Sequence, residues 1–122
     1  AAYLNDHPKV SKTIHPSLMS GEPRRRADAV LSGGYGGLCG FELKSGLEAG
    51  KTFIDSLEMF YHLANIGDAR SLAIHPASTT HSQLTPEEQL ATGVTDGYVR
   101  LSIGLEHIDD IIADLAQALD KA

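Results

Sequence analysis

One arginine on a predicted strand has the surroundings expected of an anion-binding residue. In the stretch YVRLSIG, residues 98–104, side chains alternate between two faces, so Arg100 points away from the face of Val99 and Leu101. A guanidinium on a rigid strand can bind a carboxylate through two parallel hydrogen bonds. If the strand that carries Ser71 pairs with this one, Ser71 and Arg100 could converge on one small anionic group. The alternative is that Arg100 lies on a solvated outer face of a sheet.

Two histidines flank a proline-containing loop and raise the question of a metal site. His75 and His81 are six residues apart, which is not the spacing of a helical metal-binding pair, and no cysteine or carboxylate completes a set. No nucleophile stands beside either histidine in the sequence, although a role as general base stays open. The sequence favours a loop that is ordered by hydrogen bonds from histidine to the backbone.

The glycine-rich stretch GGYGGLCG, residues 33–40, is predicted to be a tight turn that leads into a strand. It departs from G-x-G-x-x-G because Cys39 takes the last glycine position, and it lacks the Lys-Ser/Thr of a phosphate loop. Cys39 lies in an apolar strand, so we expect a small buried hydrophobic residue. As the single cysteine, it cannot form an intrachain disulfide, which fits a reducing compartment.

The elements that must position these residues alternate between strand and helix. Strands are predicted at 10–14, 38–43, 71–74 and 98–103, with a loop at 75–84. Several connections are too short for parallel crossovers. The predicted fold class is therefore α+β, a small antiparallel or mixed sheet with helices packed on one face.

Helices are predicted between these strands and at both ends of the chain. AAYLN reads like the last turn of a helix, and 22–31 can be helical up to Gly33. The capping-box signatures SGLE and TPEE begin two more, the first at Ser45 and running to about Leu63, the second at Thr85. The apolar face of the last helix comprises Ile108, Ile111, Ile112, Leu115 and Leu119, with acids on the other face.

Composition narrows the class of protein. A chain of 122 residues with 42% hydrophobic residues suits one domain with one core. The net charge is −6 and the only basic cluster is 24–26, so nucleic acid is not an expected partner. No apolar run is long enough for a membrane helix, and the N-terminus does not read as a signal peptide. Because the chain lacks an initiator methionine and opens inside a helical turn, we expect a fragment of a longer protein.

Three stretches, of which the first two overlap, carry a family resemblance that covers nearly the whole chain. They are AGKTFIDSLEMFYHLANIGDARSL (49–72), NIGDARSLAIHPASTTH (65–81) and TPEEQLATGVTDGYVRLSIGLEHIDDIIADLAQAL (85–119). The chain resembles the C-terminal domain of the Cys/Met-metabolism family of pyridoxal-phosphate enzymes, and within it the O-acetylhomoserine sulfhydrylase branch. The resemblance implies that residues 1–122 are the small C-terminal substrate-binding domain of a fold-type I enzyme, whose large cofactor-binding domain is absent.

The resemblance also implies roles for four residues. Arg100 would bind the substrate carboxylate, and Ser71 would help at the same carboxylate. Arg70 lies where the family varies and substrate preference is set, and Thr80 matches the threonine of an S-x-T-H loop near the substrate. The 75–81 loop is then a pocket wall beside a carboxylate clamp rather than a metal site.

The implied parent is a cytoplasmic homotetramer that exchanges the acetoxy group of O-acetylhomoserine for sulfide, which gives homocysteine. Its cofactor needs a lysine linkage, a group on the pyridine nitrogen and a phosphate cradle, which the family carries upstream. Neither Lys44 nor Lys51 lies in the family's cofactor-lysine context. The fragment alone is therefore expected to bind no pyridoxal phosphate and to be inactive. The alternatives are a methionine γ-lyase or cystathionine γ-synthase parent, or a free-standing, non-catalytic ligand-binding domain.

Overall fold

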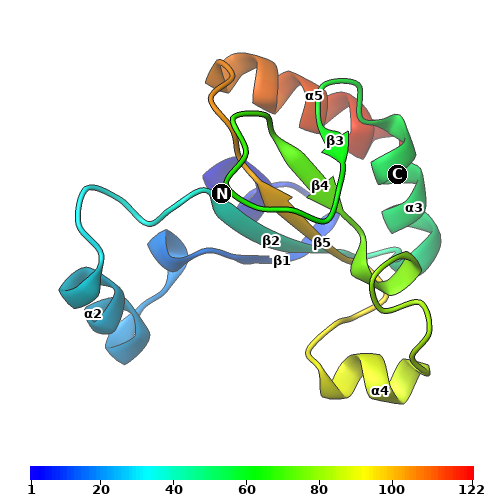
Figure 1. Cartoon of the computed structure of the whole chain (residues 1–122), viewed down its shortest axis with the longest axis horizontal. Helices are drawn as coiled ribbons and strands as arrows, with labels where there is room; N and C mark the ends of the chain where they lie inside the picture. Colours follow the sequence, from blue (N-terminus) through cyan, green and yellow to red (C-terminus); the bar gives the residue numbers. More distant parts are fainter.

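A five-stranded mixed sheet organises the chain, and the computed structural model describes all residues from 1 to 122 (Figure 1). The strand order is β1-β2-β5-β4-β3, and every neighbouring pair is antiparallel except the parallel pair β3–β4. The predicted mixed α+β architecture is confirmed. The strands are β1 (Val10–Ile14), β2 (Leu38–Leu43), β3 (Tyr61–His62), β4 (Leu72–Ile74) and β5 (Tyr98–Ser102).

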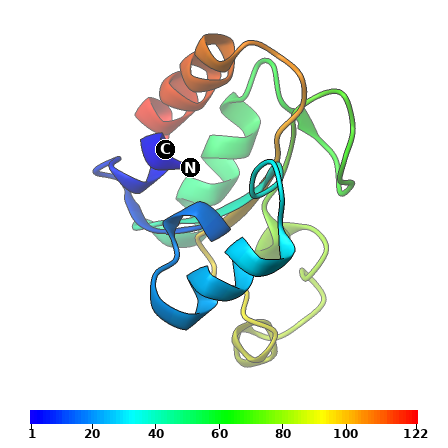
Figure 2. The same ribbon diagram turned by 90° about the vertical axis from the view of Figure 1, so that its left-hand side faces the viewer.

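Two helices cover one face of the sheet and two others project away from it. Helices α3 and α5 lie side by side over the sheet, whereas α2 and α4 extend outwards at two separate places (Figures 1 and 2). The core lies between the sheet and the α3–α5 pair, where Phe41 and Leu101 meet Phe53 and Leu119. The helices are α1 (Ala2–Asn5), α2 (Gly21–Val30), α3 (Gly46–Ser56), α4 (Pro86–Ala91) and α5 (Ile108–Lys121), with 3-10 turns η1 (Pro16–Leu18) and η2 (Pro76–Ser78).

Helix α3 is shorter than its apolar spacing predicts. It ends at Ser56 rather than near Leu63, and Tyr61 belongs to strand β3 instead of the helical face. The predicted capping box at Ser45 is also wrong, because this side chain makes no capping hydrogen bond and Gly46 follows with φ of 68°. The capping box of α4 is confirmed, since the side chains and backbones of Thr85 and Glu88 bond reciprocally.

A carboxylate on α5 explains where α3 ends. Asp114 is buried and accepts the backbone N–H groups of Glu58, Met59 and Phe60 at 2.8, 2.9 and 3.1 Å. These three donors therefore have a tertiary partner, which replaces the carbonyls that a continuing helix would supply. The expectation that all acids of α5 face away from the apolar side is wrong at this residue. The contact turns the chain out of α3 and into strand β3.

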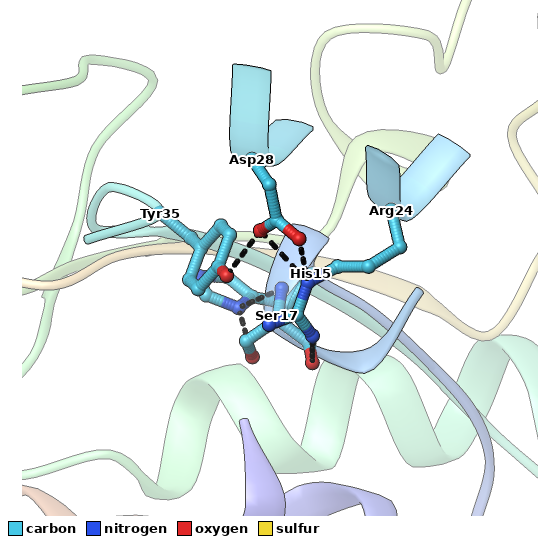
Figure 3. A network of polar contacts seen from close by, with 5 residues as sticks. All are labelled: His15, Ser17, Arg24, Asp28 and Tyr35. Atoms are coloured by element: carbon cyan, nitrogen blue, oxygen red, sulfur yellow. Dashed lines mark hydrogen bonds and ion pairs between the residues drawn. The ribbon is translucent and has the colours of Figure 1, made fainter. Parts of the chain in front are cut away.

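A polar network fixes α2 against the glycine-rich turn (Figure 3). The Tyr35 hydroxyl donates to Asp28 at 2.6 Å, and Arg24 donates to the same carboxylate at 2.9 Å. Arg24 also donates to the carbonyl of Ser17 at 3.1 Å, and the hydroxyl of Ser17 lies 2.7 Å from the His15 ring. The glycine-rich stretch leads into β2 as predicted, but residues 33–37 form bends without a turn hydrogen bond of their own, and the side chains of Asp28 and His15 hold it in place.

Candidate anion-binding site

Arg100 lies in the middle of the central strand β5. It is paired with Gly40 of β2 on one side and with Ile74 of β4 on the other, and Leu101 beside it points into the core. The alternation predicted from the sequence is therefore present, and Arg100 lies on the face opposite to α3 and α5. The side chain is partly buried rather than fully solvated.

The guanidinium of Arg100 is held on one side and free on another. One terminal nitrogen donates to the backbone carbonyl of Asn65 at 3.2 Å. The Nε–H is buried and has no hydrogen-bond partner. Because a buried donor without a partner costs about 1–3 kcal/mol, an incoming oxygen acceptor would recover free energy here. A carboxylate is the acceptor whose two oxygens match a guanidinium edge.

Ser71 is buried in a different hydrogen-bond network. Its hydroxyl donates to Glu106 at 2.8 Å and accepts the N–H of Gly104 at 2.9 Å, while its own N–H donates to Glu106 at 2.7 Å. The register pairs Ile74 with Arg100, so alternation places Ser71 on the opposite side of β4. The predicted strand pairing is present, but in this conformation it does not bring Ser71 and Arg100 together.

Glu106 is a residue of this network that sequence reasoning missed. Burial raises the pKa of its carboxyl, but the hydrogen bonds from Ser71 and from its own backbone N–H, with the charge of Arg70, together outweigh this effect and leave the pKa below its usual value. Glu106 therefore stays ionised and holds the start of β4 against the chain after β5. A glutamate in a polar turn has no sequence signature that would announce this role.

The other two predicted site residues lie in separate contacts. The guanidinium of Arg70 stacks 4.6 Å from the ring centroid of Tyr61 and donates to its hydroxyl. Thr80 is exposed, and its hydroxyl lies 2.9 Å from the ring of His81. No side-chain hydrogen bond joins any two of the four predicted site residues.

His75 orders the loop that follows β4. Its Nε2 donates to the carbonyl of Asp96 at 2.7 Å, and its Nδ1 accepts from the hydroxyl of Ser78 at 2.8 Å. Burial lowers the pKa of this imidazole, so the neutral form is the stable one. The prediction of a loop ordered by histidine hydrogen bonds to the backbone is confirmed for His75. No group of three or more His, Cys, Asp or Glu side chains could hold a metal ion.

Comparison with known proteins relates this arrangement to a family. The profile of the Cys/Met metabolism PLP-dependent enzymes, where PLP is pyridoxal phosphate, matches residues 1–120. The chain belongs to this family. The prediction made from its motifs is confirmed, and the family's dependence on pyridoxal phosphate agrees with the expected cofactor of the parent.

The chain is similar to several sulfhydrylases and lyases. It is 54% identical over 120 residues to the O-acetyl-L-homoserine sulfhydrylase of Leptospira meyeri, covering 98% of this chain and 27% of the relative. It is 45% identical over 119 residues to an L-methionine gamma-lyase of Fusobacterium nucleatum subsp. polymorphum, covering 98% of this chain and 30% of the relative. The chain thus spans under a third of the length of these relatives and matches their C-terminal part.

A solved structure has the same fold. It is a Campylobacter jejuni protein described as an O-acetylhomoserine (thiol)-lyase, with N'-pyridoxyl-lysine-5'-monophosphate at its position 205. The superposition has a TM-score of 0.88 at 43% identity and covers 98% of this chain and 28% of that one. The small C-terminal domain of a PLP-dependent enzyme is therefore the fold of this chain.

Three of the five lysines of this chain are held in contacts of their own. A lysine linkage needs a free amine beside the substrate site, but Lys44 donates to the carbonyl of Pro8 and Lys51 pairs with Glu48. The amine of Lys9 donates to three carbonyls at the C-terminal end of α5. None of these lysines contacts Arg100. The sheet face that carries Arg100 is suited to binding an anion.

Proposed function

We propose that residues 1–122 form the substrate-carboxylate-binding domain of an O-acetylhomoserine sulfhydrylase. The observation that supports this most is the buried Nε–H of Arg100, which has no partner and lies on the sheet face that the helices leave uncovered. An amino-acid substrate carries the carboxylate that would complete it. The most similar of the relatives named above, at 54% identity, bears the same activity in its name.

In this proposal the parent exchanges the acetoxy group of O-acetylhomoserine for sulfide and releases acetate and homocysteine. The cofactor and the residues that act at the substrate's γ carbon would lie outside these 122 residues, in a large N-terminal domain. The present domain would bind and orient the substrate through Arg100. The isolated chain would accordingly be inactive, and the parent would be a cytoplasmic homotetramer.

The other three predicted site residues differ in how directly they would contact the substrate. Arg70 and Thr80 are exposed and could reach a bound substrate without breaking a buried contact. Ser71 could act at the carboxylate only if its hydroxyl left Glu106. In this structure Ser71 supports the site through the position of β4. We therefore assign direct carboxylate binding to Arg100 and an indirect contribution to Ser71.

A methionine γ-lyase parent is the second candidate. It is favoured by the 45% identity to the Fusobacterium lyase over nearly the whole chain. A cystathionine γ-synthase parent would use the same carboxylate clamp. The full-length protein separates the three by product, since sulfide with O-acetylhomoserine gives homocysteine, cysteine gives cystathionine, and methionine cleavage releases methanethiol.

Substitution of Arg100 in the full-length enzyme tests the clamp. A charge-assisted bond of this kind contributes about 1.5–3 kcal/mol. Arg100→Lys keeps the charge and loses the two-pronged geometry, so kcat/KM should fall roughly ten- to hundredfold, because 1.36 kcal/mol corresponds to a factor of about ten. Arg100→Ala should fall further, with an unchanged cofactor absorbance spectrum.

The matched control is Arg26→Ala, which removes an exposed arginine on α2 that pairs only with Glu22. It should leave kcat/KM within about twofold. If Arg100→Ala also stays within about twofold, Arg100 is only a strand residue on a solvated face and the proposed clamp is wrong.

A further inference from the structure

One loop holds the guanidinium of Arg100, and we name it the 63–70 loop after its residues. It begins where the N–H of Leu63 donates to the carbonyl of Ala73 at 3.3 Å. It ends where the carbonyl of Ala69 accepts the N–H of Leu105 at 2.8 Å. One end is thus attached to β4 and the other to the chain after β5, and the loop contacts Arg100 between them.

The turn of this loop presents a carbonyl to Arg100. The side-chain oxygen of Asn65 accepts the N–H of Ile66 at 2.9 Å, and the N–H of Asn65 donates to the carbonyl of Leu63 at 3.0 Å. The backbone carbonyl of Asn65 accepts a hydrogen bond from Arg100 at 3.2 Å. Because this bond uses a terminal nitrogen, it leaves the buried Nε–H without a partner.

Ser102 attaches the middle of the loop to the strand that carries Arg100. Its hydroxyl oxygen accepts the N–H of Gly67 at 3.1 Å. Ser102 is 4% exposed and lies two residues after Arg100, so both side chains are on the same face of β5. Gly67 has φ of 72°, a conformation that favours glycine, and a Cβ there would meet nothing within 4 Å. The strand thus supplies both the arginine and the anchor of the loop that orients it.

We propose that Ser102 is a positioning residue for substrate binding, acting through the 63–70 loop on Arg100. The proposal rests on the proposed function, in which Arg100 binds the substrate carboxylate. Without the anchor at Gly67, the carbonyl of Asn65 is no longer held in place. Arg100 then has more rotamer freedom to lose when the carboxylate binds, which weakens binding without removing any group that contacts the substrate.

The test uses the full-length enzyme with O-acetyl-L-homoserine as substrate. Ser102→Ala should raise KM about three- to tenfold and leave kcat within about twofold, since the loop affects binding rather than the reacting atoms. Hydrogen–deuterium exchange should be faster in the peptide that contains the 63–70 loop and unchanged in α5. Ser11→Ala is the matched control. Ser11 lies on the edge strand β1, and its hydroxyl donates to the carbonyl of Glu42.

Gly67→Ala provides an independent variant if Ser102→Ala does not fold. It adds a methyl group in open space and strains only the backbone, so it should raise KM in the same way. Unchanged KM and unchanged loop exchange in the variant that folds would overturn the role of Ser102. If at the same time Arg100→Ala lowers kcat/KM at least tenfold, the proposed clamp stands without this anchor. If Arg100→Ala has no effect, the proposed function itself fails.

Discussion

Replacing Asp114 by alanine should destabilise the 122-residue chain by about 2–6 kcal/mol. Its carboxylate accepts three backbone N–H groups, of which only that of Phe60 belongs to a buried residue. Water can replace the carboxylate at Glu58 and Met59, at a net loss of about 0.5–1.5 kcal/mol each. The N–H of Phe60 would be left without a partner, which costs about 1–3 kcal/mol. The sum is a large part of the stability of a small domain.

Urea unfolding followed by circular dichroism measures this loss. Asp114→Ala should lower the midpoint with little change in slope, because the same surface is exposed on unfolding. Asp120→Asn is the control, since this residue is exposed in the last turn of the same helix and should change the unfolding free energy by at most about 0.5 kcal/mol.

The pH dependence of the effect follows from the carboxylate. Burial raises the pKa of Asp114, but the hydrogen bonds from the three backbone N–H groups and from the side chain of Gln117 together outweigh it and hold the pKa below its usual value. The unfolded state therefore takes up the proton first, so the contribution is complete above the unfolded pKa of about 4 and declines as the pH falls below it. The difference between wild type and Asp114→Asn should shrink below that pH. If Asp114→Ala and Asp120→Asn have equal midpoints at pH 7, the carboxylate does not stabilise the end of α3.

Three other expectations can be checked on the same chain. Burial lowers the pKa of His75, so on acidification the unfolded state binds a proton before the folded state does. The free energy of unfolding should therefore have its full value above the unfolded pKa of about 6.5 and fall as the pH drops below it. In urea titrations at pH 5 and pH 7, the unfolding free energy of His75→Gln should no longer change with pH in this way. An unchanged pH dependence would show that another group causes it. Burial raises the pKa of the Cys39 thiol, so Ellman's reagent should modify it slowly in buffer and quickly in urea, and fast reaction in buffer would contradict its burial. Dialysis with pyridoxal phosphate should leave no lysine-linked visible absorbance band, and a stoichiometric band would contradict the assignment of the cofactor lysine to another domain.

The sequence predicts those parts of the fold whose signals are local. Strand β1 ends before Pro16 and the largely apolar strand β2 begins after the glycine-rich stretch, as predicted. The end of α3 could not be predicted in this way, since the carboxylate that ends it is 56 residues away from Glu58 along the chain. Strand β3 was missed because two residues cannot show a period.

The candidate site shows the same division. Arg100 could be found because alternation along one strand gives its direction, and the structure agrees. The hydrogen bond between Ser71 and Glu106 could not be found in this way, because it joins two segments that share no sequence pattern. The contact from Asn65 is made by a backbone carbonyl, which every residue type possesses, so the identity of the side chain carries no signal. Tertiary hydrogen bonds, rather than residue patterns, decide these positions.

The order of the strands has a consequence for synthesis of the chain. β5 is the last strand to be made, yet β2 and β4 both pair with it, one on each side. While the ribosome adds residues 44–97, the edge of β2 that will pair with β5 has no partner. Once β4 is made, its edge toward β5 is also unpaired. A nascent chain that stalls before Tyr98 would expose two unpaired strand edges, which are ready templates for aggregation. A truncated product would thus fail as a whole sheet, and no partly built version of the domain would display Arg100.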